Sequence, residues 1–68
     1  MSIAPIKFVD RGSGDEGVVL VRVLEDSVGL ALSLRKNGDI EVVFGSEELD
    51  QVIVALQTAR RTLLTHEG

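Results

Sequence analysis

The hydrophobic residues of this chain change their spacing once, at Gly45 and Ser46, and this change strongly constrains the fold. Before it, the segment VGLALSL at 28–34 alternates large apolar residues with small or polar ones, which is the period of a strand with one buried face. After it, apolar residues recur at helical spacing. The sequence therefore predicts a β-meander followed by one helix, a ββββα arrangement of the α+β class.

Four antiparallel strands are expected at about residues 3–9, 18–24, 28–35 and 39–44. In the first strand, Pro5 suits a sheet edge because proline cannot donate a backbone hydrogen bond. The second and third strands are expected to pair Val19 with Leu32, Val21 with Leu30 and Val23 with Val28. This register buries the valines and turns Arg22 to the other face.

Asn37-Gly38 predicts the last hairpin, because both residues tolerate the backbone of a tight turn. A two-residue loop would place apolar residues of the two strands on opposite faces. We therefore expect a three-residue loop, with Gly38 left-handed, that keeps one face apolar. The pairs expected in that register are Leu34 with Ile40, Leu32 with Val42, Leu30 with Phe44 and Arg35 with Asp39.

A helix is expected at about residues 46–65, with Ser46 as its N-cap. Acidic residues follow in the first turn, where they complement the positive end of the helix dipole. One stripe of the helix is apolar and consists of Leu49, Val52, Ile53, Leu56, Ala59 and Leu63. We expect this stripe to pack on the apolar face of the sheet.

The segment GSGDEG at 12–17 has the spacing G-x-G-x-x-G of dinucleotide-binding loops. Such loops bind phosphate because a helix N-terminus follows them, whereas here a valine-rich strand follows. Two carboxylates, Asp15 and Glu16, would also repel a pyrophosphate. We expect residues 10–17 to form a flexible loop that binds no nucleotide.

The 68 residues are expected to form a single domain, with a core that supplies no more than about 3–5 kcal/mol. The sequence has no cysteine, so neither disulfides nor a thiolate metal site can supplement that core. Apolar residues nevertheless make up 44% of the chain. Self-association, in the form of a homodimer, is the expected source of further stability.

The second face of the predicted sheet mixes aliphatic residues with charged ones, and arginine among apolar side chains is typical of protein interfaces. We expect this face to be the interface, with the residues Val18, Leu20, Arg22, Leu24, Ala31, Ser33, Arg35 and Val43.

Residues for catalysis are scarce. The one histidine, His66, lies two residues from the C-terminus, where nothing would hold it as a general base. We expect no enzymatic activity, no cofactor and no metal site. The sequence also lacks a membrane-spanning run and a signal-peptide pattern, which favours the cytoplasm.

The leading hypothesis is a small, non-enzymatic, homodimeric interaction or regulatory module that could also contact a protein partner. Four strands followed by a helix also resemble, in topology, the PC4 family of transcription cofactors, which bind single-stranded DNA as homodimers. This resemblance implies a weak single-strand binder, although the net charge of −4 disfavours nucleic acid. A third hypothesis, based on size and charge, is an acidic phage-type inhibitor of a host factor.

Overall fold

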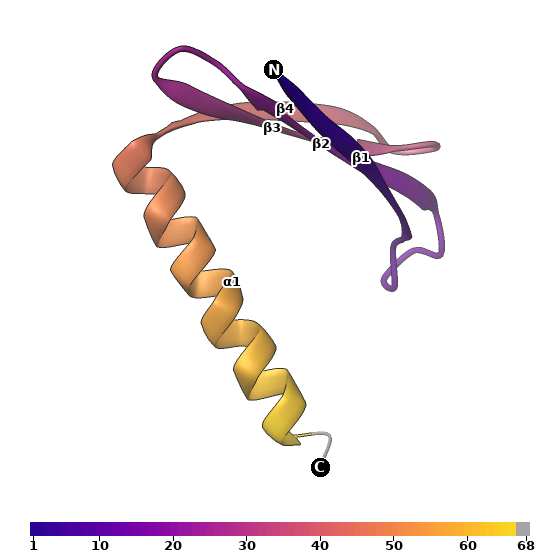
Figure 1. Cartoon of the computed structure of the whole chain (residues 1–68). Coiled ribbons are helices and arrows are strands. Elements are labelled where there is room, and N and C mark those ends of the chain that lie inside the picture. The colour runs from indigo at the N-terminus through magenta and orange to yellow at the C-terminus, as the bar shows by residue number, and fades with distance from the viewer. Residues whose placement is uncertain (67–68) are drawn as a thin grey trace.

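The computed structural model describes residues 1–66 and shows one sheet and one helix (Figure 1). The strands are β1 (Ser2–Val9), β2 (Glu16–Val23), β3 (Ser27–Leu34) and β4 (Gly38–Gly45), and helix α1 (Ser46–His66) follows directly. The strands pair antiparallel in the order β1-β2-β3-β4. The predicted ββββα fold is therefore confirmed, and each element ends within two residues of its expected position.

β1 is an edge strand, as Pro5 indicated, and its pairing with β2 contains an irregularity. Ile3 lies opposite Val21 and Ile6 opposite Val19, so three steps along β1 match two along β2. A bulge of this kind reverses the side-chain alternation. As a result, Ile3 and Ile6 share one face although they are three positions apart in the sequence.

The expected register between β2 and β3 is confirmed in all three pairs. The register between β3 and β4 differs from the expected one by two residues. Leu34 lies opposite Gly38 and Leu32 opposite Ile40, so the predicted pairing of Leu34 with Ile40 is wrong. Gly38 does have a positive φ of 86°, which glycine adopts readily.

The physical reason for the shift lies in the preceding part of the chain. The Arg35 amide donates to the Glu16 carbonyl at 2.9 Å, and the Lys36 amide donates to the Asp15 carboxylate at 2.8 Å. These bonds hold the β3–β4 turn against β2. Arg35 consequently forms its ion pair with Glu16, at 3.1 Å, and the predicted opposition of Arg35 and Asp39 is not found.

Residues 10–17, expected to be a flexible loop, form a hydrogen-bonded turn followed by the first two residues of β2. The Gly14 amide donates to the Asp10 carbonyl at 2.7 Å, and the Asp10 amide donates to the Asp15 carbonyl at 2.8 Å. Asp15 is buried, with 7% of its surface exposed. The glycine-rich segment is therefore a structural connection with its own polar contacts.

The start of α1 differs from the expected cap. The Gly45 amide donates to the Glu48 carboxylate at 3.1 Å, three residues ahead. This is the reciprocal half of a capping box, in which the residue at the third helical position binds the amide of the N-cap. Gly45 therefore occupies the N-cap position, and the assignment of Ser46 as the cap is wrong.

α1 does not cover the sheet, which corrects the expected packing of helix on sheet. Only β3 and β4 approach it, and α1 diverges from the sheet after its first turns (Figure 1). β4 ends at Gly45 and α1 begins at Ser46, so no loop residue allows the chain to reverse. Connections that fold one element back onto its neighbour normally need several residues.

Candidate interaction surfaces

The sheet has one predominantly apolar face, made of residues that lie opposite each other across the four strands. We call this the apolar face. Its rows are Ile6-Val19-Leu32-Ile40, Ile3-Val21-Leu30-Val42, Val23-Val28-Phe44 and Phe8-Gly17-Leu34-Gly38. A Cβ at Gly17 would lie 2.7 Å from Phe8 and 2.8 Å from Leu34, so this glycine serves close packing. The alternation in the sequence predicted the composition of the face for β2, β3 and β4.

The apolar face is open to solvent. Among residues 1–66, no apolar side chain is buried. In the central row, Leu32 is 42% exposed, although a strand flanks it on either side. Apolar surface this extensive is typical of interaction sites.

The helix stripe, which is the set predicted from the sequence, is open in the same way. Leu49 lines a hollow of about 450 Å³ with Val28 and Phe44, so α1 begins on the apolar side of the sheet. Leu49 and Val52 are half-buried, whereas Leu56 is 65% exposed. The stripe therefore meets its own sheet only near the start of α1.

The exposed area of the chain measures how much surface lacks a partner. A folded monomer of 7.3 kDa is expected to expose about 4,200 Å². This chain exposes 5683 Å², an excess of about 1,500 Å². Its radius of gyration is 13.7 Å, against about 11 Å for a compact chain of this length. A standard protein interface buries about 800 Å² on each partner, so the excess is sufficient for a stable dimer.

The second face carries seven of the eight predicted interface residues. Val18, Leu20, Arg22, Ala31, Ser33 and Val43 lie on it by their pairing, and Arg35 joins it through Glu16. Leu24 instead follows β2 in the turn and lines the hollow beside Leu49. Leu20 and Val43 are exposed, at 39% and 56%.

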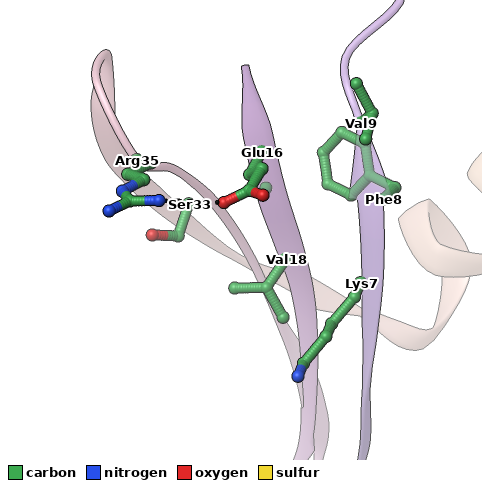
Figure 2. A pocket seen from close by; sticks show the side chains of 8 residues that line it. Lys7, Phe8, Val9, Glu16, Val18, Ser33 and Arg35 are labelled. Atoms are coloured by element: carbon green, nitrogen blue, oxygen red, sulfur yellow. Dashed lines mark hydrogen bonds and ion pairs between the residues drawn. The ribbon is translucent and has the colours of Figure 1, made fainter. Parts of the chain in front are cut away.

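Both arginines of the second face form ion pairs. The Arg22 guanidinium binds the Glu41 carboxylate, with Nε 3.1 Å from Oε2, and the Ser33 hydroxyl donates to Asp39 at 2.5 Å. In Figure 2, Glu16 points toward Arg35, and both line a hollow of about 550 Å³ that Lys7 and Val18 also border. Pairing neutralises most of the positive charge that single-strand binding would require.

The one histidine and the carboxylates are the side chains that could hold a metal ion. His66 is exposed at the end of α1. Within residues 1–66 no three histidine or carboxylate side chains gather as metal ligands would. The same residues contain no helix with the length and hydropathy needed to span a membrane.

Comparison with family models, with curated proteins and with solved structures finds no match to this chain.

Proposed function

We propose that this chain is a small, non-enzymatic, cytoplasmic interaction module that acts as a homodimer. The observation that carries the proposal is the area without a partner: about 1,500 Å² more than a folded monomer of this mass exposes. A stable fold without a buried apolar side chain in residues 1–66 requires a partner to exclude water.

A second copy is the favoured partner because the two open surfaces are both apolar and can therefore pack against each other. One is an apolar sheet face and the other an apolar helix stripe, and every chain carries both. A two-fold dimer uses each of the two surfaces twice. Two-fold symmetry is the most common symmetry of soluble homo-oligomers. The cysteine-free sequence provides no disulfide to replace this source of stability.

The test is thermal unfolding monitored by circular dichroism over a wide range of protein concentration. Folding linked to association makes the melting temperature rise with concentration. We expect such a rise. A cooperative transition with the same melting temperature at every concentration would contradict the proposal, because a monomer unfolds independently of its neighbours.

A further inference from the structure

We infer that the C-terminal part of helix α1 of one copy lies over the apolar face of the other copy, so that the dimer exchanges its helices. This inference rests on the proposed homodimer and names the occupant of its open surface. The occupant is the stretch of the helix stripe beyond Val52, where the helix has left its own sheet.

The chain cannot cover its own apolar face in the observed geometry. β4 passes into α1 without a loop residue, and the Glu48 carboxylate fixes the Gly45 amide at the junction. Half-buried Leu49 holds the first turn against the end of the sheet, where it lines a hollow with Val28 and Phe44. The rest of the helix is therefore directed away from its own strands (Figure 1).

The dimensions fit an exchange. α1 has 21 residues and is about 31 Å long, and strands of eight residues are about 26 Å long. The part of α1 beyond Val52 comprises residues 53–66 and is about 21 Å long, so it can extend along most of a partner's strand. Its free stripe offers Leu56, Ala59 and Leu63, of which the two leucines are 65% and 56% exposed. The row containing Leu32 and Ile40 offers apolar side chains to meet them.

The exchange also accounts for both open surfaces at once. A seam between two second faces would leave the apolar face and the helix stripe in water, at a large cost in free energy. A coiled coil between the two helices would cover the stripe but leave the apolar face open. Mutual exchange covers both surfaces in each copy with one two-fold operation.

The experiment is directional cross-linking between introduced cysteines. The sequence has no cysteine of its own, so every thiol that reacts is an introduced one. A chain with Leu56→Cys is mixed with a tagged chain carrying Leu32→Cys, and the two are unfolded, refolded together and treated with a short bismaleimide. We expect a covalent product of one chain of each type.

Two matched variants serve as controls. Ala31→Cys is adjacent to Leu32 in β3 but lies on the second face, and Val54→Cys lies on the side of α1 away from the stripe. Neither should yield the mixed product. If Leu32→Cys fails to refold, Ile40→Cys replaces it, since Ile40 lies in the same row and is 61% exposed.

The remaining outcomes separate the inference from the proposed function. Linkage of Leu56→Cys to Ala31→Cys, or only to Leu56→Cys of a second copy, would overturn helix exchange while leaving a homodimer. Linkage within one chain of a Leu56→Cys, Leu32→Cys double variant that sediments as a monomer would overturn both. A folded protein that sediments as a monomer and gives no mixed cross-linked product would also overturn both.

Discussion

Leu49 and Leu56 lie two helical turns apart on the same stripe of α1, yet Leu49 is half-buried against the end of the sheet and Leu56 is 65% exposed. The two leucines are equivalent in the sequence pattern. Their difference in exposure arises because the helix leaves its own sheet between them. Leu56 is therefore the residue at which self-association is best tested.

Leu56→Lys should abolish the dimer and lower the free energy of unfolding by about 2–4 kcal/mol, because a charge replaces an apolar side chain that the second copy would bury. The measurement is urea unfolding at fixed protein concentration, with the mass determined in parallel. Val54→Lys is the control, since Val54 is 59% exposed and lies off the stripe, and it should change stability by no more than about 0.5 kcal/mol. Equal effects of the two substitutions would contradict a role for the stripe.

Glu48→Ala should destabilise the protein by about 0.5–1 kcal/mol, because the Gly45 amide loses its acceptor at the helix start. Glu48→Gln should retain most of the stability, since an amide oxygen can accept the same hydrogen bond. Ser46→Ala should be nearly neutral. If urea unfolding shows that Ser46→Ala costs more than Glu48→Ala, the cap has been assigned to the wrong residue.

Asp15→Ala should destabilise the fold by about 1–3 kcal/mol, because the Lys36 amide would lose the buried carboxylate that it binds at 2.8 Å. Glu25→Ala makes the same change of charge in the exposed β2–β3 turn and should have little effect. Urea unfolding of the two variants compares them. A neutral Asp15→Ala would show that the glycine-rich connection carries no stability.

Ser13→Ala should raise the pKa of Asp10 toward its ordinary value of 3.8. The Ser13 side chain donates to the Asp10 carboxylate at 2.6 Å and the Ser13 amide at 3.1 Å, and these bonds hold the pKa of Asp10 below that value. A lowered pKa stabilises the fold fully above pH 3.8, and this contribution is lost as the pH falls through the folded pKa. Carboxyl NMR titration measures the shift, and identical titration curves for parent and variant would refute the assignment.

Much of the sheet was predictable because side chains alternate with a period of two. This period determined which residues share the apolar face, and together with the short connection around Glu25 and Asp26 it predicted the β2–β3 register. It could not determine the β3–β4 register, since a slip of two residues leaves every side chain on the same face. Asp15 and Glu16 select the register through the backbone of Lys36 and Arg35, and no local hairpin pattern contains that information.

The packing of the helix was not predictable from its stripe alone. Helical spacing shows that Leu49 and Leu56 need an apolar partner, but it does not say which element supplies it. The junction of Gly45 and Ser46 did carry a signal, because the strand and helix patterns adjoin without loop residues between them. The second face contains seven of the eight residues predicted for it. Its role as an interface stays a prediction.

Sedimentation velocity at micromolar concentration tests the central claim most directly, because it measures whether a second copy covers the open apolar surface. The account predicts a single species of twice the 7.3 kDa chain mass, which Leu56→Lys converts to monomer and Val54→Lys leaves unchanged. A folded species of 7.3 kDa that persists at this concentration would contradict it.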